Sequence, residues 1–122
     1  ISDENIHYPK QKNDLEQIDV QIKTLDSLAL VDKEKNGITL LKLDVQGYEL
    51  EVLKGAEETL KNIDYIVIEA NLEQLYTNQP SLNQMYYYLD SKGYEIKGML
   101  DFNLGNGNKY IEIDLLFSKK AK

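Results

Sequence analysis

The 122-residue chain contains no cysteine and no arginine, and each absence removes a class of chemistry. Without cysteine, neither a disulfide nor a thiolate metal site can form. Without arginine, the chain lacks the planar, bidentate group that proteins use to clamp phosphates and carboxylates. No apolar run is long enough to span a bilayer and no signal peptide is evident, so we expect a cytoplasmic protein without a membrane partner.

Acidic residues outnumber basic ones, which bears on the partners that the chain can have. The net charge is -7, and this disfavours nucleic acid and anionic membrane surfaces as partners. The only histidine, His7, has no metal-ligating or nucleophilic neighbour, so we expect an exposed loop residue and no metal site. The length predicts one domain over residues 1–122, with 1–17 as a polar loop or arm. Because the chain begins at Ile1, we expect it to be part of a longer protein.

The stretch from Ile38 to Leu60 gives the clearest indication of the fold and of a site. An apolar run predicts a strand over 38–45 that is buried on both faces, and Asp44 stands where this run ends. Gly47 then marks a turn, and the apolar spacing of residues 48–60 predicts a helix. Ligands of open α/β sheets bind at the carboxyl ends of strands, so Asp44 is the first candidate site residue.

A second buried strand is predicted from Tyr65 to Ile68, again followed by an acid, Glu69. The helix between the two runs makes the strands parallel neighbours, because such crossovers return the chain in the same direction. Asp44 and Glu69 should therefore meet at one edge of the sheet. We expect Glu69 to be a second site residue.

The remaining elements complete a mixed α/β sheet. Alternating residues predict a half-buried strand over 18–24, followed by a short helix that Thr24 or Asp26 caps and Gly37 closes. Ser81 and Gln84 have the spacing of a capping box at the start of another helix. The residues expected on the inner stripe of that helix are Leu82, Met85, Tyr86 and Leu89. Segments 94–102 and 109–118 predict an antiparallel hairpin that closes the sheet.

Two further charged residues near Asp44 have alternative interpretations. Lys42 interrupts an apolar strand, where an unpaired charge would be costly, so it either forms a structural ion pair with Asp44 or a neighbouring carboxylate, or orients Asp44 at the site. Glu49 lies in the first turn of a helix, where the macrodipole favours an acid even without a functional role.

Four blocks of sequence carry a family resemblance. They are Thr24 to Leu28, Leu41 to Glu49, Val52 to Ala56 and Ile66 to Glu69. In order and spacing they resemble the FkbM-type methyltransferases, which are S-adenosylmethionine-dependent. The resemblance implies a three-layer, Rossmann-like class I methyltransferase fold, present in part. It also implies O-methylation of a small-molecule acceptor or a sugar. Asp44, Glu49 and Lys42 would then be catalytic, and Asp44 and Glu69 would bind the cofactor.

The sequence departs from the family pattern in two respects. Gln46 stands where the family usually has glutamate, and the glycine-rich loop that binds the cofactor is not found. We therefore expect the carboxyl-terminal half of a methyltransferase domain, which self-associates or pairs with the missing half. The alternative is a non-catalytic module that binds a partner through an exposed sheet edge. A metal-dependent hydrolase using Asp44 and Glu69 is less favoured, because no histidine lies near either acid.

Overall fold

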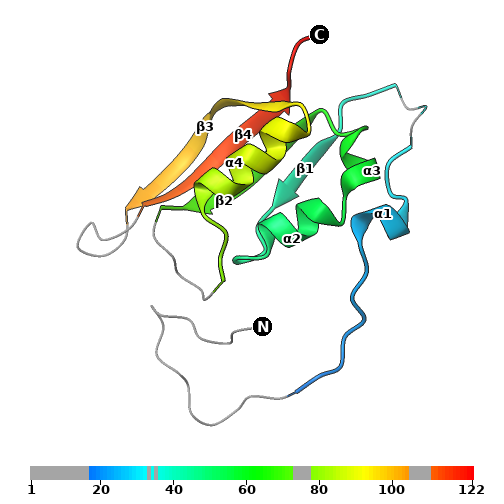
Figure 1. Cartoon of the computed structure of the whole chain (residues 1–122), viewed down its shortest axis with the longest axis horizontal. Coiled ribbons are helices and arrows are strands. Elements are labelled where there is room, and N and C mark those ends of the chain that lie inside the picture. The colour runs from blue at the N-terminus through cyan, green and yellow to red at the C-terminus, as the bar shows by residue number, and fades with distance from the viewer. Residues whose placement is uncertain (1–16, 33, 35, 73–77, 105–110) are drawn as a thin grey trace.

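A four-stranded mixed sheet in the order β1-β2-β4-β3 forms the centre of the chain (Figure 1). The computed structural model describes residues 17–32, 34, 36–72, 78–104 and 111–122. The strands are β1 (Leu40–Leu43), β2 (Tyr65–Asn71), β3 (Tyr94–Leu104) and β4 (Ile111–Lys119). The helices are α1 (Leu25–Leu28), α2 (Glu49–Lys54), α3 (Glu57–Leu60) and α4 (Leu82–Ser91).

The pairing of the strands confirms the predicted sheet. β1 and β2 are parallel, with Leu41 opposite Ile66 and Leu43 opposite Ile68. β4 pairs antiparallel with β2, and β3 pairs antiparallel with β4. The hairpin strands thus lie beyond β2 and close the sheet on that side, as the sequence predicted. Residues 105–110, which join the two strands of the predicted hairpin, lie outside the described residues.

All four helices pack against one face of this sheet. Ile66 and Ile68 of β2 belong to the same buried cluster as Leu53 of α2 and Leu89 of α4, and α1 joins it through Leu25. No described helix covers the opposite face, so two layers are present among the described residues. The α/β class is confirmed, whereas the three-layer arrangement goes beyond what the described part of the chain contains.

The prediction that the strand over 38–45 is buried on both faces is wrong, because no described helix covers one face of the sheet. Leu43 is buried, but Leu40 is 56% exposed and Ile38 is 77% exposed. Lys42 shares the bare face with Leu40 and is exposed as well. An apolar run therefore marked the strand correctly, but burial on its second face requires a covering layer that no described element provides.

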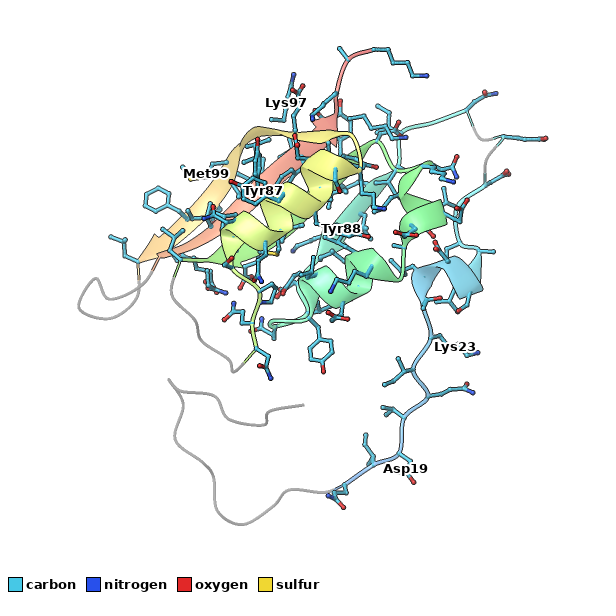
Figure 2. The ribbon with its side chains drawn as sticks, viewed as in Figure 1. Asp19, Lys23, Tyr87, Tyr88, Lys97 and Met99 are labelled. Carbon is cyan, nitrogen blue, oxygen red and sulfur yellow. The ribbon has the colours of Figure 1, made fainter. Side chains whose placement is uncertain are left out.

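The strand predicted over 18–24 is not formed. Residues 17–24 have no regular secondary structure, and the side chains of Ile18, Val20 and Ile22 are 73%, 72% and 85% exposed. Asp19 and Lys23 lie on this stretch, which runs away from the packed body (Figure 2). The prediction was wrong because alternation describes a strand only where a neighbouring strand supplies hydrogen bonds, and no described strand lies beside this one.

The first helix begins as predicted but ends earlier. Thr24 is its N-cap, and the Thr24 hydroxyl accepts a hydrogen bond from the Ser27 N–H at 3.1 Å. The helix ends at Ala29, whose backbone is left-handed with φ 46°, and not at Gly37. Asp26 explains why so short a helix is held in place. Its carboxylate accepts hydrogen bonds from the Thr59 N–H at 2.8 Å and the Thr59 hydroxyl at 2.7 Å, which joins α1 to α3.

The helix predicted over 48–60 is divided into α2 and α3 at Gly55. A Cβ atom at Gly55 would lie 3.2 Å from the Thr24 Cβ, so the close approach of α1 favours glycine here. Two ion pairs follow the break. Lys61 pairs with Glu58 at 2.8 Å, and Glu57 pairs with Lys92 of α4 at 2.8 Å.

The capping box at the start of α4 is confirmed. The Ser81 hydroxyl accepts from the Gln84 N–H at 3.2 Å, and the Gln84 side chain accepts from the Ser81 N–H at 2.8 Å. Met85 and Leu89 are buried as predicted, but Tyr86 is exposed. Tyr88 takes its place toward α2, where its hydroxyl donates to the Leu53 carbonyl at 3.3 Å (Figure 2). The position of α2 therefore determines that Tyr88, and not Tyr86, packs inward.

Across the described residues, no helix combines the length and the apolar character that crossing a membrane would require.

Candidate active site

Asp44 lies directly after β1, at the end of the sheet where the polypeptide turns into α2. Its side chain is exposed, and its carboxylate accepts a hydrogen bond from the Gln46 side-chain amide at 2.9 Å. The turn needs left-handed backbone at two consecutive positions, Gln46 with φ 51° and Gly47 with φ 100°. Glycine adopts this conformation without steric cost, which explains why the predicted turn is built around Gly47.

Glu49 is buried beneath this turn, with only 4% of its surface exposed. Its carboxylate accepts a hydrogen bond from the Gly47 N–H at 3.1 Å and another from the Val45 N–H at 3.3 Å. Two backbone donors that no helix or strand uses are thereby satisfied. Glu49 therefore holds the backbone that follows Asp44, which is a positioning contact. Its predicted catalytic role stays a prediction.

Glu69 lies on β2, on the face of the sheet that no described helix covers. The pKa of Glu69 is raised to about 8. A hydrogen bond with Glu112 is the main cause, followed by partial burial and by the negative charges of Glu112, Asp44 and Asp114. The structure thus brings Asp44 and Glu69 close enough for one charge to affect the other, as their positions at the ends of parallel strands predicted.

Acids of the hairpin join this site, and the sequence analysis did not identify them. Asp114 of β4 is the register partner of Glu69, and Asp101 of β3 is the register partner of Asp114. Glu112 lies two residues before Asp114 on the same face. The alternation of acidic and apolar residues in β4 did indicate that these acids face away from the core. The pairing of β4 with β2, which places them beside Glu69, could not be read from that alternation.

Lys42 is placed differently from the expectation. It is exposed on the uncovered face, opposite Val67 of β2. Because the lysine is not buried, the argument that it needs a carboxylate partner no longer applies. Within the described ranges, no ion pair joins Lys42 to Asp44. A role for Lys42 in orienting Asp44 stays a prediction without a supporting contact.

Comparison with known families identifies the unit that carries these residues. The methyltransferase FkbM domain matches residues 1–96. This chain belongs to the FkbM methyltransferase family. No curated protein and no solved structure matches it.

The FkbM match contains Asp44, Glu49 and Glu69 and ends before β4. Glu112 and Asp114 therefore lie outside the matched part and reach the site through strand pairing. Carboxylates near the carboxyl ends of neighbouring parallel strands create a negative electrostatic potential, which favours a cationic ligand. A carboxylate can also accept a proton from a hydroxyl group. Both abilities are relevant to methyl transfer from a cationic donor.

Proposed function

We propose that this chain supplies the carboxyl-terminal part of an S-adenosylmethionine-dependent methyltransferase that methylates a hydroxyl group of a small molecule or a sugar. The observation that carries the proposal is the placement of Asp44 and Glu69. Asp44 directly follows β1 and Glu69 lies on the adjacent parallel strand β2. Leu43 and Ile68, the residues before them, are register partners, and the chain belongs to the FkbM family. Ligands of open α/β sheets bind at this edge.

The chemistry of these side chains fits S-adenosylmethionine. When bound, this donor supplies an electrophilic methyl group on a positively charged sulfur. Asp44 is exposed and its charge acts on Glu69, so the two acids together suit a cationic group. Asp44 and Glu69 are the residues of this chain that would hold the donor.

The chain's own residues would then position the acceptor and receive its proton. Displacement at a methyl group depends mainly on holding the two reactants in line, which favours a rigid site. Glu49 supplies rigidity through its hydrogen bonds to the turn after Asp44. Glu69 has a pKa of about 8, so it exchanges a proton near neutral pH, which suits a general base. Asp44 would accept a hydrogen bond from the acceptor hydroxyl.

The test is methyl transfer from radiolabelled S-adenosylmethionine to a panel of hydroxyl compounds. The chain should be assayed both alone and together with all sequence encoded upstream of Ile1. We expect transfer only in the second case, and weak or absent binding of S-adenosylmethionine to the chain alone by calorimetry. Tight, stoichiometric binding to the chain alone would contradict the proposed division of the site.

The open edge of the sheet favours a second candidate function, a non-catalytic module that binds a partner by strand addition. β1 is the edge strand, and Leu40 on it is exposed. Exposed edge strands pair readily with another strand. The same assay separates the two functions. The absence of methyl transfer with upstream sequence present, combined with binding of an extended peptide at β1, would favour the module.

A further inference from the structure

β3 forms the edge of the sheet opposite to β1, and no described strand lies beyond it. A strand in this position presents backbone N–H and C=O groups that another strand can pair with. Lys97 and Met99 lie along this margin of the sheet (Figure 2). Five apolar side chains of β3 are between 44% and 58% exposed, namely Ile96, Met99, Leu100, Phe102 and Leu104. An edge strand with this many exposed apolar side chains is suited to strand addition.

The two faces of β3 are arranged symmetrically about Met99. Ile96, Met99 and Phe102 pair with residues of β4 that belong to the core or pack against it, so these three lie on the helix side of the sheet. Gly98 and Asp101 pair with residues of the other face. Ile96 and Phe102 are equally far from Met99 along the strand. A two-fold axis through Met99 would therefore place Ile96 of one copy opposite Phe102 of another, on the same face.

Two register shifts in β3 follow the same symmetry. The pairing with β4 shifts between Ile96 and Gly98 and again between Met99 and Asp101, so one extra residue stands on each side of Met99. Such irregularities protect an edge, because a regular strand cannot match them. About the two-fold axis, however, segment 97–98 of one copy lies opposite segment 100–101 of the other. Both strands then carry their extra residue at the same place, and a second copy of β3 matches this edge better than a regular strand does.

The charges of β3 are complementary under this symmetry. Lys97 and Asp101 are equally far from the axis, so each would lie opposite the other in the second copy. Among the described residues, no ion pair involves either side chain. Asp101 is also the register partner of Asp114, and a cation beyond the edge would offset the repulsion between these two acids. Glu95 would lie opposite the neutral Asn103, so no like charges meet across the axis.

We propose that two copies of this chain pair antiparallel through β3 about a two-fold axis at Met99, with Lys97 of each copy opposite Asp101 of the other. The two sheets then form one continuous sheet, and the exposed apolar side chains of both edges cover one another. The two contacts between Lys97 and Asp101 select this register over its neighbours. This pairing holds whether or not the chain takes part in methyl transfer.

Charge reversal in the whole chain tests the register. All variants carry Leu40→Lys, which adds charge to the other edge strand, β1, so that association through β3 is measured. Lys97→Asp places acids opposite each other at both contacts, and Asp101→Lys places lysines there. Each should weaken self-association about tenfold or more in sedimentation equilibrium. Mixing the two variants should restore the affinity, because the mixed dimer again has opposite charges at both contacts.

Three outcomes of this experiment would overturn the proposal. They are a parent that stays monomeric at every concentration, unchanged affinity in the two single variants, and no gain on mixing. Lys23→Asp and Asp19→Lys are the matched controls, since they change the net charge equally on the exposed segment before α1 (Figure 2). They should neither weaken association nor gain affinity on mixing. An equal gain on mixing the controls would show that net charge, and not the register of β3, causes the effect, and it would overturn the proposal as well.

The absence of cysteine from the chain allows a direct measurement at the axis. Met99→Cys would place two thiols opposite each other, where antiparallel strands hold the Cα atoms roughly 4.5–5.5 Å apart, a separation that a disulfide spans. Tyr87→Cys is the control, because Tyr87 is on α4 and is more exposed than Met99. We expect mild oxidation to link the Met99→Cys copies much faster than the Tyr87→Cys copies. Equal rates would overturn the proposal.

Discussion

Glu69 of β2 and Glu112 of β4 lie diagonally across two paired strands on one face of the sheet, because Glu69 is opposite Asp114 and Glu112 is two residues before Asp114. A hydrogen bond between two such carboxyl groups requires that one of them carries a proton, because two ionised carboxylates have no donor between them. This contact is the main reason that the pKa of Glu69 is raised to about 8, with burial and the charges of Glu112, Asp44 and Asp114 as further causes. The pair is therefore sensitive to pH near neutrality.

The first prediction concerns stability against pH. In the unfolded chain Glu69 loses its proton near the ordinary value of 4.5, and in the folded chain near 8. Between these values the folded state binds more protons, so the free energy of unfolding should fall as pH rises from about 4.5 to about 8. Thermal unfolding followed by circular dichroism across this range measures the effect.

Glu69→Gln should flatten this dependence, because the amide donates a hydrogen bond to Glu112 at every pH. Its melting temperature should exceed that of the wild type above pH 8. Glu95→Gln, a change to an exposed glutamate of β3, is the control and should keep the wild-type profile. A Glu69→Gln profile as steep as that of the wild type would show that another group causes the dependence.

The second prediction is that Asp44 and Glu49, two acids at the β1–α2 turn, differ in their effects on turnover and on stability. Asp44→Asn, tested in a preparation whose wild-type form shows methyl transfer, should lower turnover about 100-fold or more, because it removes a charge at the site. Its stability should change by less than about 0.5 kcal/mol, since Asp44 is exposed. Methyl-transfer kinetics and thermal unfolding measure the two effects. Wild-type turnover in Asp44→Asn would contradict a role for this residue in donor binding or catalysis.

Glu49→Leu should behave in the opposite way with respect to stability. Leucine removes both oxygens that accept from the Gly47 and Val45 N–H groups, whereas Glu49→Gln keeps one acceptor oxygen and should be milder. We expect a loss of about 1–3 kcal/mol in the free energy of unfolding, the cost of leaving buried backbone donors unpaired. Urea denaturation measures it, and an unchanged midpoint would show that the turn holds without Glu49.

The third prediction concerns Tyr94, which is 1% exposed. Its hydroxyl lies 2.6 Å from the carbonyl oxygens of both Leu60 and Ile63, and so connects the start of β3 with the end of α3. Tyr94→Phe should lower the free energy of unfolding by about 1–3 kcal/mol, because a buried carbonyl loses its donor. Tyr87→Phe, on the exposed side of α4, is the control in the same urea titration. Equal midpoints for the two variants would contradict the expected role of the Tyr94 hydroxyl.

The fourth prediction is that the chain alone self-associates through β1. Among the described residues β1 is an edge strand with no further strand on its outer side, and Leu40 on it is exposed. We expect the apparent mass in analytical ultracentrifugation to rise with concentration, and Leu40→Lys to reduce that rise by adding charge at the edge. Leu30→Lys, an exposed change after α1, should have no effect. A monomer at every concentration would show that the edge is protected.

Features that depend on nearby residues were predictable from the sequence. Gly47 marked a turn because its backbone is left-handed, and Ser81 with Gln84 marked the start of α4 because a capping box joins residues of one helical turn. The parallel pairing of β1 with β2 was predictable for a related reason. A helix between two apolar runs leaves few other arrangements.

Tertiary structure alone decided which side chains meet across longer distances in the chain. Glu112 lies beside Glu69 only because β4 pairs with β2 in one register, and a shift of one residue would move it to the other face. Tyr88, and not Tyr86, is packed because α2 lies on that side of α4. The segment 17–24 has a strand's alternation but no described strand beside it. Local sequence therefore determined the caps, the turn and the strands that find a partner, whereas the formation of a strand at 17–24, burial and the acidic site depended on contacts between elements, which no single segment encodes.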